Sequence, residues 1–251
     1  MELIILMAAI GVVSGSIGGI GGPGGVPVLL LLNLGIALSP PVAAATASSI
    51  FVIATITATG LYYYSDGIDW LLAASVGVPA LIGTRIGAQV TPKLPVHVFE
   101  TILAGILLFT TIGIVYQQRH SSSSPSEYAL EWRTAQILVK ITLSSSLIGV
   151  IAGLTGIGGP ALTVPLLIYF GIAPITAIGA GLASGILISI STALGHVFQG
   201  NTPAFYPFIT IGVPYIFSQV IGWRFAHNVS KKTVSYTIAG VAVLGSVLLF
   251  V

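Results

Sequence analysis

The sequence predicts an all-α protein: a polytopic bundle of transmembrane helices made of two homologous repeats, each with a helix that is broken by glycine and proline or is re-entrant. Three observations predict it: the composition, two long uncharged runs, and a glycine-proline string that occurs twice. Of the 251 residues, 55% are hydrophobic and 6% are charged, whereas soluble domains carry about 25% charged residues. This composition excludes a soluble enzyme, a nucleic-acid-binding protein and a disordered chain, because 8 basic and 6 acidic side chains cannot cover a water-exposed surface.

Two uncharged runs are too long for a single membrane crossing. No side chain that ionises at pH 7 occurs in the 63 residues from Leu3 to Ser65 and, apart from His196, none occurs in the 83 residues from Ile141 to Trp223. One crossing takes about 20 apolar residues, and a charge at a helix centre costs roughly 2.5–3.5 kcal/mol on insertion. Each run therefore contains several spans. No basic segment precedes the first apolar stretch, so we expect that stretch to be retained as a span.

Ten apolar segments follow one another in two sets of five. The first predicted repeat, residues 1–116, has segments at residues 3–18, 26–37, 41–64, 70–90 and 96–116. The second predicted repeat, residues 134–251, has segments at residues 134–154, 162–172, 175–198, 204–226 and 233–251. Residues 117–133 between them are rich in serine and carry charges, which predicts a hydrophilic linker.

The two sets match each other in order. The string Gly19-Ile20-Gly21-Gly22-Pro23 recurs as Gly156-Ile157-Gly158-Gly159-Pro160. Further matches at offsets of 135–138 residues are Val26-Pro27 with Val164-Pro165, Gly35-Ile36-Ala37 with Gly171-Ile172-Ala173, and Gly77-Val78-Pro79 with Gly212-Val213-Pro214. Collinear matches indicate a duplication. Internal repeats are common in transporters, where they place the binding site between the halves.

The two glycine-proline clusters, residues 18–25 and 156–160, are predicted to interrupt helices at membrane depth. Glycine costs about 1 kcal/mol relative to alanine in a helix, and proline lacks the N–H donor. The short segments after the clusters reach only about 18 Å as helices, against a hydrocarbon core of ~30 Å, so we expect half-helices or re-entrant hairpins. Irregular backbone in the bilayer has to be buried in protein or line a wet cavity. The N–H groups of the helices that follow suit an anion.

The predicted anion site combines this backbone with nearby side chains. For the pairs Gly11/Gly15 and Gly83/Gly87 we favour close helix packing instead of binding. The substrate-binding candidates are Gly19, Gly21, Gly22, Pro23, Gly24, Thr46, Ser48, Ser49, Thr155, Gly156, Gly158, Gly159, Pro160, Ser184 and His196. A single hydroxyl in a membrane helix more often bonds to its own backbone, but as a group they suit a small oxyanion. His196 is predicted either to contact the anion or move a proton, or to be a solvated histidine at the interface.

The sequence offers no group typical of cation coupling or thiol chemistry. The acidic residues fall at segment ends or in loops, whereas cation-driven carriers often keep a carboxylate near the midplane. Because the chain has no cysteine, a disulfide and a thiolate metal site are excluded. We therefore expect no cofactor and no metal, and an anion transport that is passive or coupled through His196.

Two topologies are open at this stage. Lys93, Lys231 and Lys232 lie in equivalent loops after the fourth segments. If both loops are cytoplasmic, the short segments do not cross, each repeat has four spans, and the repeats are parallel. Otherwise the loops lie on opposite faces and the repeats are inverted.

These motifs resemble the TauE/SafE sulfite exporter family, also described as the 4-toluene sulfonate uptake permease group. The resemblance rests on Gly-x-Gly-Gly followed by Val-Pro in both halves and on the turns at residues 196–201 and 68–70, and it covers nearly the whole chain outside residues 117–133. Pro23 and Pro160 depart from the family's usual glycine, and the first half lacks the histidine. The resemblance implies transport of sulfite, thiosulfate, a sulfonate or another small sulfur-containing anion across the cytoplasmic membrane.

We therefore predict a secondary transporter or exporter, not an enzyme, with the anion bound at the repeat interface. A passive anion channel is the alternative. An intramembrane serine hydrolase is disfavoured, because its only pair, Ser184 and His196, would be about 18 Å apart along one helix. The expected partners are the small anion and the lipid bilayer, without nucleic acid; a homo-oligomer is left open.

Overall fold

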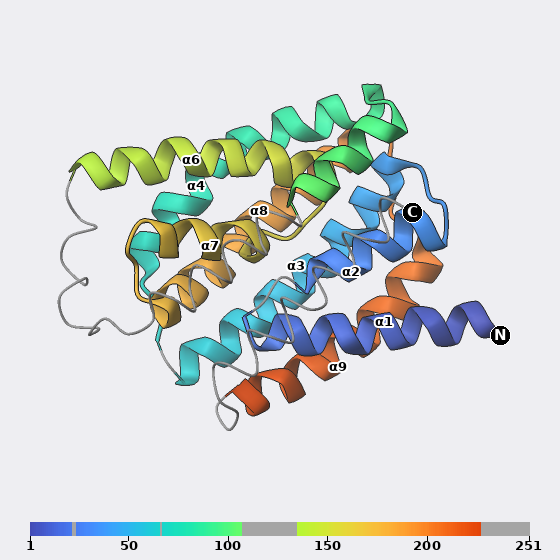
Figure 1. Ribbon diagram of the computed structural model, residues 1–251, viewed down its shortest axis with the longest axis horizontal. Helices are drawn as coiled ribbons and strands as arrows, with labels where there is room; N and C mark the ends of the chain where they lie inside the picture. The colour runs from blue at the N-terminus through green and yellow to red at the C-terminus, as the bar shows by residue number, and fades with distance from the viewer. Residues whose placement is uncertain (22–23, 66, 107–134, 227–251) are drawn as a thin grey trace.

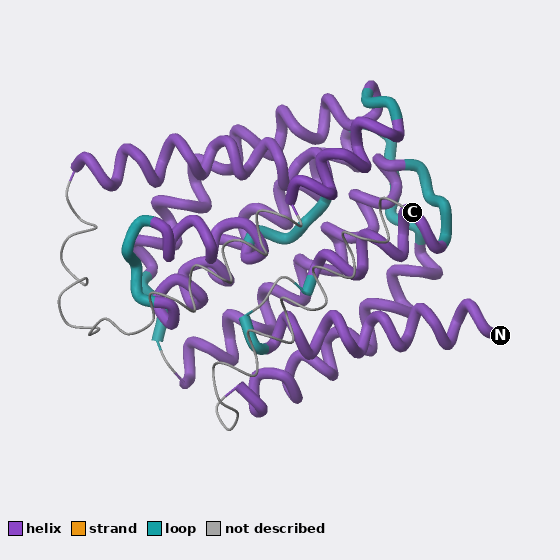
Figure 2. Tube along the Cα trace, viewed as in Figure 1, coloured by secondary structure: helices purple, strands orange, loops and turns teal. Residues whose placement is uncertain are grey.

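The computed structural model confirms an all-helical bundle (Figures 1 and 2). It describes residues 1–21, 24–65, 67–106 and 135–226, and these residues contain no β-strand. Six of the described helices are long and apolar enough to cross a membrane. They are α1 (Glu2–Gly19), α3 (Pro40–Ser65), α4 (Trp70–Val90), α6 (Ala135–Thr155), α8 (Pro174–Phe198) and α9 (Phe205–Ala226). The chain is therefore a multi-pass membrane protein.

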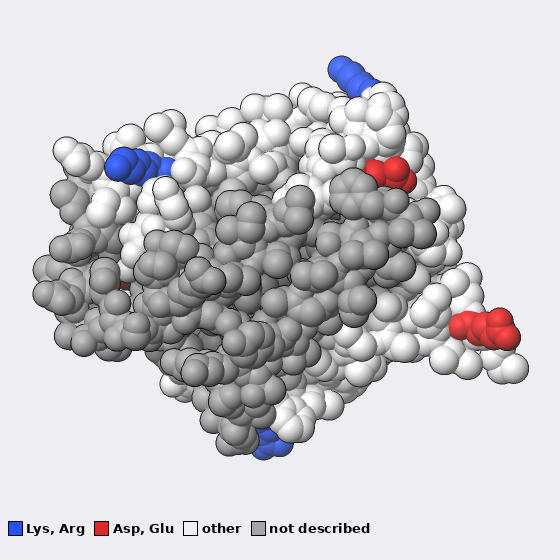
Figure 3. Space-filling view, in the orientation of Figure 1, with Lys and Arg blue, Asp and Glu red and all other residues white. Residues whose placement is uncertain are grey.

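The surface of the bundle is that of a protein in lipid. Large apolar side chains lie on the outside: Ile82 is 70% exposed, Leu143 67% and Phe217 71%. The few charged side chains on the face in Figure 3 stand apart from one another near its margins. An apolar exterior of this kind is stable only where the solvent is hydrocarbon.

Shorter helices occupy the segments that follow the glycine-proline clusters. Helix α2 (Gly25–Leu30) continues as a π-helical turn over Leu31–Gly35, and α7 spans Pro160–Tyr169. Helix α7 begins two residues earlier than predicted, because proline fits the first helical position, where no N–H is needed. A 3₁₀ turn covers Thr91–Lys93, and Val96–Ile106 is helical. The rest of the predicted fifth segment, the linker and the predicted tenth segment lie outside the described residues.

Glycines bring α1 against α9 and α4 against α6 at short range. A Cβ added to Gly15 would overlap the Tyr215 carbonyl of α9, and one added to Gly87 would overlap the Val150 carbonyl of α6. On the partner helix, Gly153 of α6 lies equally close to the backbone of α4. These contacts confirm that the two glycine pairs assigned to packing do pack helices together.

The contacts between helices also fix their relative directions. Gly11 lies against Ile211 and Gly19 against Gln219, so α1 and α9 are parallel. Gly83 lies against Ser146 and Gly87 against Leu154, so α4 is parallel to α6. Gly77 lies against Leu187 and Thr84 against Ser191, so α4 is also parallel to α8.

Helix α3 is placed in the same way. Ile50 lies against Gly212 and Ser65 against Trp223, so α3 is parallel to α9. Thr55 lies against Gly185 and Gly67 against Gly179, so α3 and α8 are antiparallel. Helices α1, α3 and α9 run one way across the bundle and α4, α6 and α8 the other way (Figure 1).

The two halves therefore have opposite orientations. Helices α1 and α6, α3 and α8, and α4 and α9 come from matching segments of the two predicted repeats, and each pair runs in opposite directions. The parallel arrangement with four spans per half is wrong, because α1 and α3 run the same way and α2 returns the chain between them. The C-terminal ends of α4 and α9 consequently lie at opposite faces; Lys231 and Lys232 themselves lie outside the described residues. The duplication and its boundaries stay predictions.

Candidate functional site

The chain reverses direction at both glycine-proline clusters. After the first cluster, a Cβ on Gly24 would overlap the Ser14 carbonyl, so the chain has folded back along α1. After the second, Pro160 lies beside Gly185 and Val164 beside Gly181, so α7 runs antiparallel to α8 and hence to α6. Since α1 and α6 run in opposite directions, the two hairpins enter the bundle from opposite faces.

Two glycines make the reversals sterically feasible. Gly21 has φ +84° and Gly156 has φ +76°, a backbone conformation that residues with a Cβ adopt rarely. A Cβ on Gly156 would overlap the Ala44 carbonyl of α3, and one on Gly21 would lie 2.7 Å from a methyl carbon of Ile178 on α8. Each hairpin turn therefore presses against the long central helix of the opposite half.

The two turns meet at one aromatic ring. Phe51 of α3 is 2% exposed. A Cβ on Gly25 would lie 2.9 Å from this ring, and one on Gly158 would lie 3.1 Å from it. The ring packs edge-on against Tyr215 of α9, with centroids 5.9 Å apart. Phe51 thus separates the tip of one hairpin from the tip of the other.

A small cavity lies at this meeting point. It offers about 30 Å³ to the centres of water-sized molecules, which is room for about two waters. Both turns line it, together with α1, α3, α7, α8 and α9. The lining residues are Gly18, Gly24, Gly25, Phe51, Ala54, Thr55, Gly158, Pro160, Ala161, Leu182, Tyr215 and Gln219.

The cavity wall is uncharged but presents free polar atoms. Among the described residues, no backbone hydrogen bond is donated by the amides of Gly158 and Gly159. The side-chain oxygen of Gln219, a residue 2% exposed, has no hydrogen-bond partner in the described part of the chain. The later amides of the second turn are occupied, because Ala161 donates to the Gly158 carbonyl at 3.3 Å. Neutral dipoles without partners can exchange water for a small polar solute.

Three of the predicted glycines and prolines line the cavity. They are Gly24, Gly158 and Pro160. Gly19, Gly21, Gly156 and Gly159 pack the turns against neighbouring helices. Gly22 and Pro23 lie outside the described residues.

The predicted hydroxyls are directed to backbone carbonyls and do not line the cavity. Thr46, Ser48, Ser49, Thr155 and Ser184 each donate to a carbonyl three or four residues earlier on the same helix. Thr46 also accepts a hydrogen bond from the Ala204 amide at 2.9 Å, which ties the start of α9 to α3. Thr155 accepts from the Ile157 amide at 3.3 Å and so supports the second turn.

His196 is enclosed in the protein. Its side chain is 0% exposed, and its Nε2 donates to the Gly153 carbonyl at 2.9 Å. His196 is therefore not exposed at the membrane interface, as one of the two predicted alternatives required. Ser184 donates to Gly181, a different carbonyl, so the two side chains do not form a nucleophile–base pair.

Outside the predicted glycine-proline clusters, sequence reasoning missed seven residues of the cavity: Phe51, Ala54, Thr55, Ala161, Leu182, Tyr215 and Gln219. Six of them are ordinary residues of apolar helices and carry no local signal. Gln219 is different, because an amide side chain inside an uncharged span is costly unless it has a partner or a role. That signal was available from the sequence.

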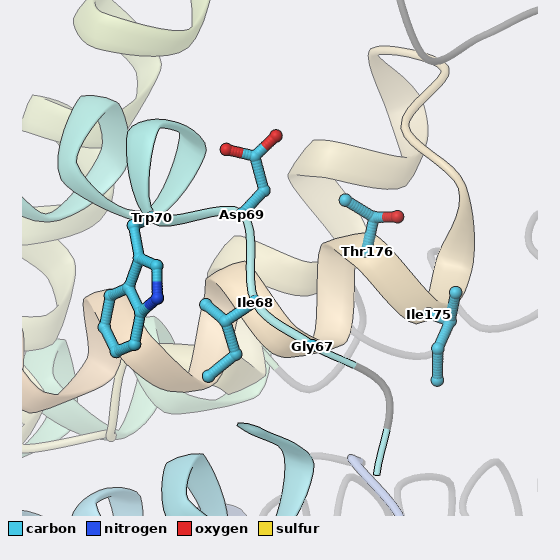
Figure 4. A pocket seen from close by; sticks show the side chains of 6 residues that line it. All are labelled: Gly67, Ile68, Asp69, Trp70, Ile175 and Thr176. Atoms are coloured by element: carbon cyan, nitrogen blue, oxygen red, sulfur yellow. The ribbon is translucent and has the colours of Figure 1, made fainter. Parts of the chain in front are cut away.

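A larger hollow of about 460 Å³ opens at the turn between α3 and α4 (Figure 4). It is lined by Gly67, Ile68, Asp69, Trp70, Ile175 and Thr176. Asp69 accepts a hydrogen bond from the Leu72 amide at 3.0 Å and so caps α4. An acidic side chain in an open surface hollow disfavours an anion, so we place the site at the smaller, buried cavity.

Sequence comparison relates the chain to membrane transporters. The family described as Sulfite exporter TauE/SafE matches residues 3–249. The Bacillus subtilis (strain 168) protein named Probable membrane transporter protein YdhB is 26% identical over 205 residues, 80% of each chain. Probable membrane transporter protein YunE from the same organism is 29% identical over 113 residues, 43% of this chain and 40% of its own. No solved structure matches.

Proposed function

Because the chain belongs to the TauE/SafE sulfite exporter family of membrane transporters, we propose that it is a secondary transporter for a small sulfur-containing anion. Sulfite, thiosulfate and sulfonates are the substrate class, and the cytoplasmic membrane is the site of action. The observation that carries the proposal is the cavity at which two hairpins from opposite faces meet.

The chemistry of the cavity favours an anion over a cation. Backbone N–H groups at Gly158 and Gly159 and the partial positive charge at the start of α7 supply donors, and the NH₂ group of Gln219, not its oxygen, is a further donor. No acidic side chain is among the lining residues. A site built from neutral dipoles replaces part of the hydration shell of an oxyanion and still releases it, because no formal countercharge holds it.

The small volume supports a carrier more than an open channel. Space for about two waters is too little for an oxyanion of four or more heavy atoms, so this conformation is closed. Movement of either hairpin away from Phe51 would enlarge the cavity toward one face. Such alternate opening around a central site is how inverted halves work in other transporters.

Flux measurements on the purified protein in liposomes test the proposal. We expect wild type to take up ³⁵S-labelled sulfite, thiosulfate or a sulfonate, and Gln219→Leu to lower that flux at least tenfold. The Gln219→Leu variant should unfold at a temperature no lower than that of wild type, because the change removes a buried acceptor that has no partner. Phe217→Leu on the same helix, at a side chain 71% exposed, is the matched control. Absence of flux for all three anions, or equal flux in Gln219→Leu, would count against the proposal.

Flux kinetics separate the carrier from a passive channel. A carrier gives saturable flux that rises when a counter-anion is present on the opposite side. A channel gives flux that grows linearly with concentration and follows the membrane voltage.

A further inference from the structure

One face of α8 carries a row of buried polar groups that have no hydrogen-bond partner. Ser189 Oγ, Thr192 Oγ1 and His196 Nδ1 are unpartnered within the described part of the chain, and the three side chains are at most 1% exposed. Their spacing of three and four residues places them on one helix face. Leu182, seven residues before Ser189, lies on the same face and lines the cavity. The polar row therefore begins about 10 Å along α8 from Leu182 and runs to the end of the helix.

A second row leads from the cavity in the opposite direction. Thr55 of α3 lines the cavity, and Thr59 lies one turn further along the same helix face. Thr59 Oγ1 is buried without a partner among the described residues, and so is the Gln219 oxygen of neighbouring α9. Because α3 and α8 are antiparallel, the row on α3 runs toward the face opposite to the one where α8 ends.

In depth, the row on α3 overlaps the stretch of α8 that runs from Leu182 to His196. Thr55 lies beside Gly185 of α8, and Ala58 packs with Leu182, so Thr59 lies close to the level of Leu182. From that level to His196 the helix rises about 21 Å, against ~30 Å for the hydrocarbon core. The α8 row therefore reaches the end of its helix, and the α3 row stops about 9 Å before Ser65, the last residue of α3.

Packing gives no reason for these groups to be polar. A buried hydroxyl without a partner destabilises a fold, and an apolar group of the same shape would avoid that cost. Many other hydroxyls of this chain, such as Thr163, bond to their own helix. Groups without partners that follow one another away from a cavity have the chemistry of a wetted wall.

We propose that the two rows are hydrated half-paths that connect the cavity to opposite faces of the membrane. The row on α8, from Ser189 to His196, serves the face where α8 ends; the row formed by Thr59 and Gln219 serves the other face. The solute they carry is the small anion, a statement that rests on the proposed function. The paths themselves rest on the unpartnered groups.

Because the chain contains no cysteine, single cysteines give a direct test in oriented proteoliposomes. The probe is 2-sulfonatoethyl methanethiosulfonate, an anionic thiol reagent that does not cross lipid. We expect Ser189→Cys and Thr192→Cys to react from the face where α8 ends, and Thr59→Cys to react from the opposite face. The controls Ala180→Cys and Ala152→Cys replace alanines that are 0% exposed in apolar clusters, and they should react at least tenfold more slowly.

The labelling pattern decides the matter independently of transport. The half-paths would be overturned if Ser189→Cys and Thr59→Cys did not react, if both reacted from one face, or if the controls reacted equally fast. Labelling as expected without flux of any sulfur anion would leave the paths standing and refute the proposed function. Flux of the anion together with cysteines that do not react would refute the half-paths and leave the proposed function standing.

Thr192→Val gives a second test with little risk to folding. The change keeps the shape of the side chain and removes only the hydroxyl. We expect anion flux to fall at least fivefold while the unfolding temperature stays the same or rises. Unchanged flux would show that this row is not on the path.

Discussion

Gly153 sets the distance between α6 and α4, because its missing Cβ leaves room for the backbone of Thr84. We predict that Gly153→Ala lowers the free energy of unfolding by about 1–3 kcal/mol, as overpacking does in tight interiors. Thermal unfolding in detergent measures the effect. Gly60→Ala on α3 is the control: a Cβ there would meet nothing within 4 Å, and alanine favours a helix by roughly 1 kcal/mol over glycine. Equal stability of the two variants would contradict this account of the α4–α6 contact.

Thr46 joins two helices through a single hydroxyl. It donates to the Val42 carbonyl at 2.7 Å and accepts from the Ala204 amide at 2.9 Å. Thr46→Val would leave that amide without its partner, so we expect a loss of about 1–3 kcal/mol in unfolding free energy. Thr57→Val on the same helix is the matched control, because the hydroxyl of Thr57 bonds only to its own helix, at Ile53. If both variants unfold at the same temperature, the link to α9 contributes nothing.

The two hairpin turns press on different kinds of neighbour, which makes them respond differently to the same change. Gly156→Ala brings a Cβ against the Ala44 carbonyl, a backbone atom that cannot rotate away. Gly21→Ala meets only the side chain of Ile178. Both substitutions add backbone strain of about 1–2 kcal/mol at positive φ.

We therefore predict that Gly156→Ala destabilises the protein more than Gly21→Ala, and that Ile178→Ala partly restores the Gly21→Ala variant. Unfolding temperatures and anion flux of the three variants check this. A Gly156→Ala protein as stable as Gly21→Ala, or no recovery in the double variant, would show that the turns are not wedged against the central helices.

At the scale of elements, the uncharged runs and the glycine-proline strings were sufficient to predict the long helices and the short helices after the turns. Both signals are local: a crossing needs a run of apolar residues, and a turn needs residues that leave the helix. Of the cavity, only the glycines and the proline of the two turns were predictable from the sequence. Phe51 and Tyr215 look like ordinary apolar-helix residues, and they become part of the site because α3 and α9 meet the hairpins. Contacts between residues so far apart in the chain leave no mark in local composition.

Helix direction was also beyond local signals. With so few charged residues, the positive-inside rule rested on three lysines and favoured the wrong arrangement. The direction follows instead from the order of close contacts, such as Gly11 with Ile211 before Gly19 with Gln219. Glycine spacing shows that two helices pack closely, but the partner and its direction are decided by the whole bundle.

The alternating access that we propose depends on a property of the whole molecule, the opposite orientation of the halves, since each hairpin then faces a different side of the membrane. This orientation gives a prediction that distinguishes it from the parallel arrangement. We expect single cysteines at Lys93, after α4, and at Phe225, near the end of α9, to be labelled from opposite faces by a maleimide that does not cross lipid. Phe225 is 58% exposed and lies one residue before the end of α9.

Tyr64, near the end of α3 and 88% exposed, provides the reference. Helix α3 is parallel to α9 and α4 leads back to the first face, so Tyr64→Cys should be labelled together with Phe225→Cys and apart from Lys93→Cys. In the parallel arrangement the position at Phe225 instead shares the face of Lys93. Labelling of Lys93→Cys and Phe225→Cys from one side would therefore refute the inverted halves. A central cavity reached from both faces would then need another explanation, because both hairpins would enter from the same side.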